Sequence, residues 1–439
     1  MTRLQHLGWF LARGFGPHGW GHDSLGWGYD WTRPDLYQES ARALDQAGID
    51  LLIIEDAPSL GGPETLDLRV RAAFGGPKHD PLLLAPYLFA ATRHLGVVPT
   101  VNPAAVLPYT AARQLASLQH LSGGRLGINV VTDVGSARHF SDAPPLSHDS
   151  AYDRAEEWLA GVRDLWRSWD DGALVADPVT GRYADGSRLR PVRHRGEHYA
   201  FDGPLNAIPF PDGDEPAIVS PGGSARGLGF AGANSDVQLA LAPLTQEGVR
   251  AYRAKVHAAA RDAGRAPEDV KVLFAIKPVL VSSPEEADRV VAASARPDEA
   301  TLLRVAEQQS SDLETDLTAL DLDAPLPPGT FGEHVSHGSV RRLVGDHDVA
   351  TTPLRALLTV FARAGRIADR SGWVGTADEL ADLIEELGEW GNDGVLLWGD
   401  LHPVTVHRTL DELVPILRRR GILRTEHAEG GLRANLRSF

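Results

Sequence analysis

The chain has 439 residues, a formal net charge of −16 and no cysteine. Its length allows a large buried core, in one big domain with insertions or in two domains. The absence of cysteine excludes disulfides, zinc–cysteine sites, iron–sulfur clusters and cysteine nucleophiles. The acidic charge, with no basic cluster beyond residues 417–421, argues against nucleic acid as a partner.

The apolar residues, 43% of the chain, occur in short runs. No uninterrupted apolar window of about 18 residues could span a bilayer, so we expect no membrane-spanning segment. Residues 1–15 contain Arg13 and no small-residue cleavage site, which argues against a secretory signal. We therefore expect a cytoplasmic protein.

Short β-rich runs alternate with longer amphipathic segments along the chain. The predicted strands are residues 6–12, 51–56, 95–102, 125–132, 216–220, 237–242, 270–281 and 394–400. The predicted helices are residues 34–48, 107–124, 152–166, 245–264 and 405–421. Continuously apolar strands that alternate with amphipathic helices indicate an α/β protein with a parallel sheet.

An open doubly wound sheet and a closed (β/α)8 TIM barrel both satisfy this alternation. The count of eight strands favours the barrel, and so does the position of a glycine-rich turn in mid-chain, because a dinucleotide fingerprint usually follows the first strand. Residues 171–215 and 295–372 interrupt the pattern and are predicted to be insertions on the barrel.

The glycine-rich turn, VSPGGSARGLGFAG, covers residues 219–232 and passes from a strand into a small-residue helix. Ser224 stands where the helix begins, so its hydroxyl and the free amides of the first turn face the same space. That space attracts a dianion such as a phosphate. Alternatively, Ser224 only caps the helix, and the turn alone does not decide between the two.

Polar residues follow several predicted strands. Asp56, after Glu55, ends one strand just before Pro58 and is either a functional carboxylate on the barrel rim or the cap of a turn. The next two predicted strands end in neutral polar residues, namely Thr100, Asn102, Asn129 and Thr132. Such neutral groups suit a heteroaromatic cofactor ring, but they also commonly just close strand ends.

His148 precedes a predicted helix whose first turn carries Tyr152. One interpretation is that Asp149 or Ser150 caps this helix while His148 and Tyr152 point together towards a ligand. The alternative is that Tyr152 is ordinary packing.

Three histidine pairs lie in predicted loops, namely His18 with His22, His194 with His198, and His334 with His337. None has a nearby carboxylate at a convincing ligand spacing, so no metal site is predicted. The chain also lacks a GxSxG elbow and a P-loop lysine motif.

Taken in order, these pieces resemble the flavin-dependent monooxygenases of the bacterial-luciferase-like superfamily, specifically the nitrilotriacetate, EDTA and dibenzothiophene-sulfone monooxygenase group. The resemblance covers nearly the whole chain. Its most specific stretches are residues 165–186, 194–213, 373–382 and 418–436, which look like this group's insertion, linker and C-terminal tail.

The resemblance implies one barrel domain over residues 1–439, with the two insertions and the tail. It implies that reduced FMN, supplied by a separate NAD(P)H-dependent flavin reductase, reacts with O2. A flavin C4a-(hydro)peroxide would then oxygenate a small organic substrate. A homo-oligomer, either a dimer or a tetramer, is also expected.

Carried over position by position, the family's flavin contacts fall on Asp56, Thr100, His148, Tyr152 and Ser224. The phosphate at the glycine turn would then be the FMN 5′-phosphate, on Ser224. No catalytic acid or base is assigned. The residues expected to line the pocket are His18, Trp20, Asp56, Asn129 and His148.

The chain departs from the family pattern near the expected ring and substrate side. Residues 220–222 read Ser-Pro-Gly where the family usually has Gln-Ala-Gly, Asp212 replaces a Gln, residues 102–104 read Asn-Pro-Ala, and Asp133 replaces a Ser. These departures therefore count against inheritance of the family's substrate more than against flavin binding.

Arg13 and Arg138 do not form a cluster, which favours a neutral or aromatic substrate. Two alternative functions stay open: a deazaflavin-dependent barrel oxidoreductase, and a flavin-binding protein without turnover.

Overall fold

In the computed structural model, eight parallel strands form a closed barrel in the order β1-β14-β11-β10-β9-β4-β3-β2. These strands are β1 (His6–Leu11), β2 (Leu51–Ile54), β3 (Gly96–Val101), β4 (Gly127–Val130), β9 (Ala217–Ser220), β10 (Val237–Ala240), β11 (Lys271–Ile276) and β14 (Gly394–Gly399). The structure describes residues 3–11, 30, 32–60, 63, 66–71, 78–132, 137, 139–142, 144, 146–211, 213–313, 315–331, 335, 340, 343–362 and 373–439. The predicted (β/α)8 TIM barrel is confirmed.

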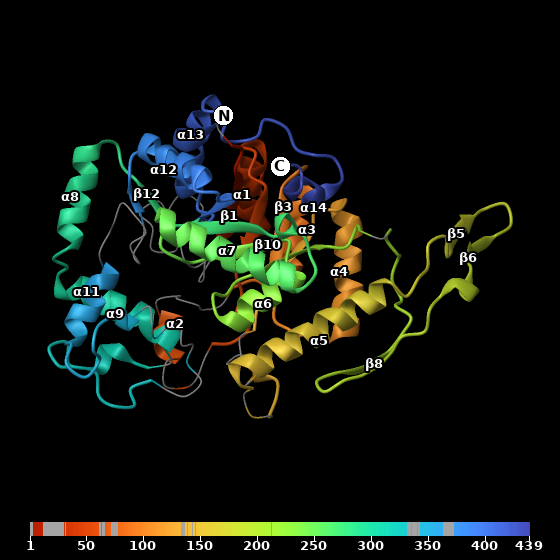
Figure 1. Cartoon of the computed structure of the whole chain (residues 1–439), viewed down its shortest axis with the longest axis horizontal. Coiled ribbons are helices and arrows are strands. Elements are labelled where there is room, and N and C mark those ends of the chain that lie inside the picture. The colour runs from red at the N-terminus through yellow and green to blue at the C-terminus, as the bar shows by residue number, and fades with distance from the viewer. Residues whose placement is uncertain are drawn as a thin grey trace.

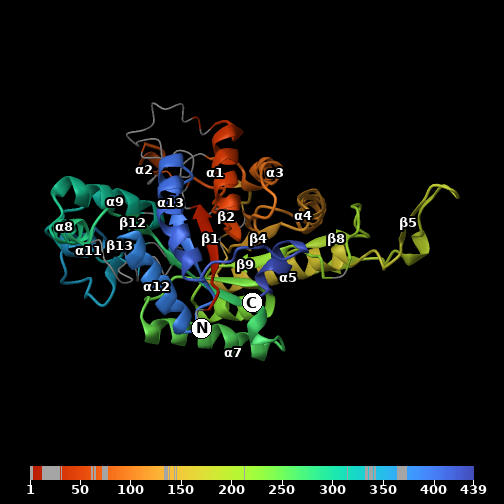
Figure 2. The same cartoon turned by 90° about the horizontal axis from the view of Figure 1, so that it is seen from above.

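Helices surround the barrel strands (Figures 1 and 2). They are α1 (Pro34–Gln46), α2 (Leu66–Arg71), α3 (Pro81–Ala91), α4 (Pro108–Ser122), α5 (His148–Trp166), α6 (Ala225–Asn234), α7 (Gln246–Asp262), α8 (Pro284–Ser294), α9 (Glu299–Leu313), α11 (Leu354–Ala362), α12 (Ala377–Glu389), α13 (Pro403–Arg419) and α14 (Gly431–Leu436). Short 3-10 helices lie at η4 (Gly186–Arg188), η5 (Pro267–Asp269) and η6 (Leu317–Ala319). No helix in these described ranges is long and apolar enough to cross a membrane.

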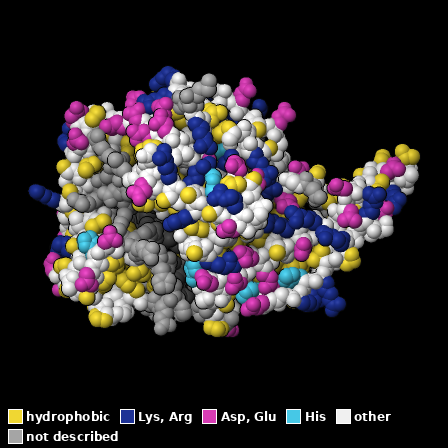
Figure 3. All heavy atoms as spheres, in the orientation of Figure 1, with side chains coloured by type: hydrophobic (Ala, Val, Ile, Leu, Met, Phe, Trp, Pro, Cys, Tyr) yellow, Lys and Arg dark blue, Asp and Glu magenta, His cyan; other side chains and the backbone are white. Residues whose placement is uncertain are grey.

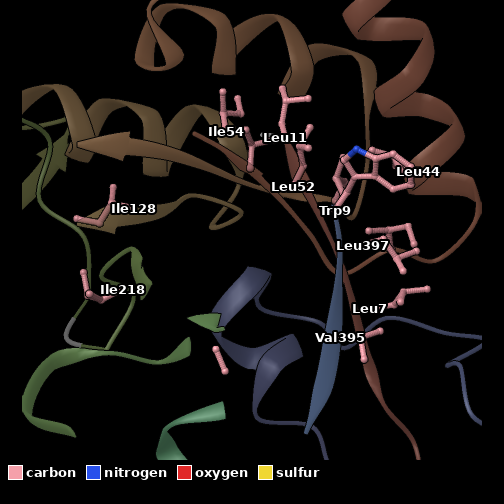
Figure 4. Close-up of a cluster of buried hydrophobic side chains, with 14 of the residues drawn as sticks. Leu7, Trp9, Leu11, Leu44, Leu52, Ile54, Ile128, Ile218, Val395 and Leu397 are labelled. Atoms are coloured by element: carbon pink, nitrogen blue, oxygen red, sulfur yellow. The ribbon is translucent and has the colours of Figure 1, made fainter. Parts of the chain in front are cut away.

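Alternate side chains of the barrel strands point to opposite sides, and both sides are buried. On β1, Leu7, Trp9 and Leu11 share the outer cluster with Leu44 of α1 (Figure 4). The barrel interior is a second cluster, which includes Leu51, Ile53, Val98, Val219, Val237, Leu239, Leu273 and Leu396. Burial on both sides explains why the strands read as continuous apolar runs.

The C-terminal helix α14 closes the amino-terminal end of this interior. Its Leu432 and Leu436 belong to the inner cluster. Gly96 and Gly127 begin two neighbouring strands, and a Cβ on Gly96 would lie 2.6 Å from a methyl carbon of Leu432. The absence of side chains at the starts of β3 and β4 therefore makes room for the tail.

A buried polar network fixes the same tail. Asp50, which precedes β2, accepts hydrogen bonds from the Leu7 amide at 3.1 Å and the Asn435 amide at 2.8 Å. It also forms an ion pair with Arg424, with Nε and Oδ1 2.8 Å apart, and lies 3.1 Å from His6 Nδ1. Burial alone would raise the pKa of Asp50, but the contact with His6, the charge of Arg424 and the hydrogen bond from the Leu7 amide outweigh burial and lower that pKa.

Between α5 and β9 the chain leaves the barrel and forms two hairpins, β5 (Leu174–Asp177) with β6 (Arg182–Ala184) and β7 (Arg193–Arg195) with β8 (Ala200–Asp202). The β5–β6 hairpin projects from the body of the molecule as an arm (Figures 1 and 2). On the other side, α9, η6 and α11 build a separate hydrophobic cluster that includes Leu302, Leu317 and Leu357. That both stretches are insertions in one domain stays a prediction.

The predicted strand over residues 270–281 is wrong in one respect. It breaks after Ile276 into β11, in the barrel, and β12 (Pro278–Leu280), which pairs with β13 (Trp373–Gly375) outside it. Pro278 has no N–H to continue a ladder. The second half of the apolar run therefore turns away to a different partner.

We expect Leu432→Ala to lower the free energy of unfolding by about 2 to 5 kcal/mol, because it opens a cavity under a packed interior. Urea denaturation measures this quantity. Leu121→Ala is the control, since Leu121 is 79% exposed and its truncation is expected to change stability by less than about 0.5 kcal/mol. A loss for Leu432→Ala as small as the control's would show that α14 does not seal the barrel.

Candidate functional site

The five predicted site residues follow four strands that are neighbours in the barrel. β2, β3, β4 and β9 are consecutive in the sheet. Asp56 lies just after β2, Thr100 lies in β3, His148 and Tyr152 begin α5 after β4, and Ser224 precedes α6 after β9. Because parallel strands end on one face, these residues lie along one arc of the carboxyl-terminal rim.

Ser224 is the N-cap of α6, so the capping interpretation is confirmed. Its backbone is extended and its Oγ accepts a hydrogen bond from the Gly227 amide at 3.0 Å. The side chain is nevertheless exposed and lies 3.4 Å from His148 Nε2. Among the described residues, the amides of Ala225 and Arg226 have no acceptor. Capping therefore leaves free donors at this helix end.

The glycines of the turn admit the Tyr152 hydroxyl. Gly222 has a φ of +115°, and a Cβ there would lie 2.8 Å from the Tyr152 Oη. A Cβ on Gly227 would lie 2.7 Å from the same atom. The Gly222 carbonyl accepts hydrogen bonds from Gln238 Nε2 at 2.7 Å and from the Tyr252 hydroxyl at 3.0 Å. The turn is thus held open for Tyr152 and anchored from β10 and α7.

Ser220 stands at the entry of this turn, where the family usually has Gln. Its side chain contacts residues that support the turn rather than the expected ring side. It is buried at the end of β9, and its hydroxyl lies 2.7 Å from Ser235 Oγ. It also donates to Gln238 Oε1 at 3.0 Å. Since Gln238 holds Gly222, the unusual residue belongs to the scaffold of the turn.

His148 and Tyr152 lie together at the start of α5. Their rings meet edge to face with centroids 5.2 Å apart, and His148 Nδ1 lies 2.8 Å from Asp149 Oδ1. Burial raises the pKa of Tyr152, while contacts of its hydroxyl with Thr132 and Ser224 partly offset the shift. The two rings are in contact, and Tyr152 is buried in the main hydrophobic core, as the packing alternative expects. That the two side chains point together towards a ligand stays a prediction.

The cap of α5 was assigned wrongly from the sequence. Ser147, with an extended backbone, is the N-cap and its Oγ accepts from the Ser150 amide at 3.1 Å. The helix begins at His148, so Asp149 and Ser150 lie inside the first turn. Ser, Asp and Ser in close succession all suit a cap, and the sequence alone does not order them.

Thr100 and Asn129 pair across β3 and β4. Asn129 Nδ2 donates to Thr100 Oγ1 at 2.8 Å, and that hydroxyl donates to the Ile54 carbonyl at 2.7 Å. Both residues are buried, and Asn129 Oδ1 has no partner in the part of the chain that the structure describes. Asn102, in contrast, accepts from the Ala104 amide at 2.9 Å and closes a turn.

Asp56 lies beside Glu55 and a lysine that sequence analysis missed. Lys78 Nζ is 2.8 Å from Glu55 Oε2 and 3.6 Å from Asp56 Oδ1. The pKa of Asp56 is raised to about 6, mainly by burial and also by Glu55 and Asp80, while Lys78 partly offsets the shift. The chain has few lysines, so a lysine that follows two rim carboxylates in the sequence was the signal that could have indicated this ion pair.

Two expected pocket residues, His18 and Trp20, lie outside the described residues, as do Asp133 and Asp212. The pair His194 and His198 does have a carboxylate nearby, because Glu157 Oε1 lies 2.8 Å from His194 Nε2. Glu157 comes from α5, far away in sequence. Within the described residues, no group of three His, Asp or Glu side chains is placed to hold a metal.

Residues 20–394 match the luciferase-like monooxygenase family. The chain is 31% identical over 460 residues to dibenzothiophene-sulfone monooxygenase of Rhodococcus erythropolis (strain XP), covering 99% of this chain and 96% of that protein. It is 30% identical over 431 residues to nitrilotriacetate monooxygenase component A of Aminobacter aminovorans, covering 94% and 92%. The solved structure of a riboflavin lyase, with modified FMN and riboflavin, superimposes with a TM-score of 0.82 at 26% identity, covering 100% and 96%.

These matches extend over nearly the whole chain and agree with the barrel topology. The chain therefore belongs to the luciferase-like monooxygenase family and is a flavin-dependent monooxygenase.

Proposed function

We propose that the chain is the oxygenating component of a two-component monooxygenase in the cytoplasm. It would bind reduced FMN from a separate NAD(P)H-dependent flavin reductase and oxygenate a small organic substrate with O2. The convergence of His148, Tyr152 and Ser224 on the free amino end of α6 carries the proposal. The "component A" of the nitrilotriacetate relative and the FMN in the riboflavin lyase structure also support it.

The amino end of α6 fits the flavin phosphate. Ser224 Oγ and the amides of Ala225 and Arg226 offer donors on an exposed surface, and the helix dipole favours negative charge there. The Arg226 side chain is already engaged, 2.6 Å from Asp153 and 2.7 Å from Glu156 on α5. Arg226 therefore fixes α6 against α5, and backbone amides with Ser224 and His148 would hold the phosphate.

The rim from β2 to β4 fits the flavin ring. Asn129 Oδ1, which has no partner among the described residues, would accept a hydrogen bond from a ring N–H, and Thr100 holds the Asn129 side chain from its other end. Asp56 would face the polar edge of the ring with a carboxyl group that changes its protonation near pH 6. Neutral donors and acceptors with one titratable group suit a heteroaromatic ring better than a sugar.

When bound, reduced FMN supplies the two electrons by which O2 is divided between the oxygenated product and water. The protein would bind and orient the flavin and shield it from water. Tyr152 packs on the buried Phe230, with ring centroids 5.9 Å apart, which fixes the Tyr152 ring beside the proposed phosphate site. His148 is oriented by Asp149 at 2.8 Å. No described residue is assigned a proton transfer.

The substrate is proposed to be neutral or aromatic at the centre that is oxygenated. Among the described cations beside the proposed flavin contacts, Lys78 is paired with Glu55 and Arg226 with Asp153 and Glu156. Cations that are already paired leave little attraction for a substrate carboxylate.

Anaerobic titration with reduced FMN, followed by an oxygen pulse, tests the function. We expect tight binding of reduced FMN and a transient flavin absorbance that differs from those of reduced and oxidised flavin. Binding without a transient would indicate a flavin-binding protein without turnover. Binding of reduced deazaflavin in preference to reduced FMN would indicate a hydride-transferring barrel enzyme and contradict the proposal.

Ser224→Ala is expected to weaken the binding of reduced FMN by about 1 to 3 kcal/mol, because it removes a hydrogen bond to a charged group. Anaerobic fluorescence titration measures the dissociation constant. The matched control is Ser283→Ala, since Ser283 caps α8 in the same way, accepting from the Glu286 amide at 3.2 Å. Equal affinities for the two variants would place the phosphate away from α6.

Asp56→Asn is expected to remove a pH dependence between about pH 4 and 6. Because the pKa of Asp56 is raised in the folded protein from 3.8 to about 6, the folded state holds the proton over this range. Its contribution to stability therefore falls as pH rises from 4 to 6, by up to about 3 kcal/mol.

Urea denaturation of wild type and variant across this pH range measures the difference. Asp411→Asn on the exposed side of α13 is the control, and it should leave the pH profile unchanged. An Asp56→Asn profile parallel to that of the wild type would show that Asp56 does not titrate in this range.

A further inference from the structure

A cavity with an excess of positive charge among its lining residues lies at the amino-terminal end of the barrel. It has a volume of about 220 Å³ and lies between the carboxyl ends of α5 and α6, the residues that precede β9 and β10, and the tail helix α14. Since strands begin at this face, the cavity is separate from the rim that carries Ser224. One helix, α6, connects the two places, with Ser224 at its start and Asn234 at its end.

Five arginines and two carboxylates provide the charged groups that line this cavity. The arginines are Arg163, Arg167, Arg265, Arg433 and Arg437. The carboxylates are Glu215 and Asp236, and both are largely buried. The chain as a whole has a net charge of −16, so a cavity lined by five arginines and only two carboxylates is a strong local exception. Figure 3 shows Lys and Arg side chains gathered between the body and the arm.

The two carboxylates are shared by three of the arginines. Asp236 Oδ2 lies 3.0 Å from Arg433, and its Oδ1 lies 3.5 Å from Arg437. Glu215 lies 2.7 Å from Arg167. Both carboxylates that line the cavity are therefore already in ion pairs.

Arg163 and Arg265 are left without a carboxylate among the described residues. Arg163 donates to Asn234 Oδ1 at 2.7 Å and to the Asn234 carbonyl at 3.3 Å, and Arg265 donates to the Gly232 carbonyl at 2.9 Å. These acceptors lie at the carboxyl end of α6, whose dipole supplies about half a negative charge. Half a charge does not balance an excess of three.

The pKa values of both guanidinium groups are lowered, first by burial and then by the neighbouring arginines. Burial lowers the pKa of Arg163, Glu215 and Asp236 raise it, and the neighbouring Arg433 and Arg167 lower it further. Burial also lowers the pKa of Arg265, Asp236 and Asp269 raise it, and Arg437 and Arg433 lower it further. The arginines therefore repel one another in a partly desolvated site, and an anion would relieve that repulsion.

We propose that this cavity is a binding site for a dianion of the phosphate or sulfate type. Guanidinium groups present N–H donors in a planar fork that matches two oxygens of such an ion. Each of Arg163 and Arg265 still has donors that make no described hydrogen bond. The volume corresponds to roughly seven water molecules at about 30 Å³ each, which leaves room for a tetrahedral oxyanion.

The bound anion would hold the tail in place. Arg433 is in α14, next to the Leu432 that enters the barrel interior, and Arg437 follows the same helix. Arg163 and Arg265 come from α5 and from the segment after α7. An ion shared by these arginines links the tail to elements on which the flavin turn is built, and it stabilises the folded state by mass action.

Thermal unfolding in sodium phosphate or sodium sulfate, compared with sodium chloride at equal ionic strength, tests the site. We expect the dianions to raise the midpoint of the wild type by about 1 to 3 °C over chloride. Arg437→Ala should abolish most of this difference. Asp236 keeps Arg433 in that variant, so the protein should fold. Arg437→Lys keeps the positive charge but loses the planar pair of guanidinium donors, so it should retain part of the difference between dianion and chloride.

Arg408→Ala is the matched control, because Arg408 is 47% exposed and paired with Glu412, whereas Arg437 is 50% exposed and paired with Asp236. The control should keep the full dianion difference. Ser224→Ala separates this cavity from the proposed flavin phosphate site. A difference that survives in Arg437→Ala but is lost in Ser224→Ala would place the anion at α6 and overturn the proposal, as would no difference in the wild type.

Ribose 5-phosphate distinguishes a free oxyanion from the phosphate group of a larger molecule. A second cavity of about 540 Å³ adjoins the first and shares Glu215, Arg433 and Arg437 with it. A shift equal to that of phosphate supports a free oxyanion. A larger shift that Arg437→Ala abolishes supports an organic phosphate whose body enters the adjoining cavity.

Discussion

The pairing of β1 with β14 is the interaction on which the rest of the structure depends. These strands come from opposite ends of the chain, and their register runs from His6 beside Gly394 to Leu11 beside Gly399. This pairing closes the sheet, so every strand must end on the same rim. Without closure, Asp56, Thr100, Tyr152 and Ser224 would lie along an open edge rather than around one space.

Closure also leaves an interior that would be open at its amino-terminal end, and the tail helix α14 fills that end. Leu432 fills the space above Gly96 and Gly127, while Asp50 bonds to Asn435 and pairs with Arg424. The apolar and polar contacts are both buried, so the tail is part of the core. The amino-terminal end of the barrel interior is thus filled by the tail, whereas the carboxyl-terminal end carries polar side chains such as Thr100 and Asn129.

The barrel could be predicted from the sequence because its strands are buried on both sides and read as apolar runs, such as LLII in β2. The apolar pattern could not reveal α3, whose sequence PLLLAPYLFAA has no polar face, nor the break between Ile276 and Pro278. Of the site, Ser224 was recognisable because a helix start has a local signature. Gln238 was not, since its role depends on β9 and β10, which pair only in the fold.

The β5–β6 arm gives the molecule a part that can be changed with little effect on the rest. Val179 at its turn is 92% exposed, and the chain contains no cysteine. A cysteine introduced at Val179 would therefore be the sole thiol, and a fluorescent or spin label could be attached there in one step. The projecting arm would carry that probe far from the barrel interior, where it could report on encounters with other macromolecules while the flavin chemistry proceeds unlabelled.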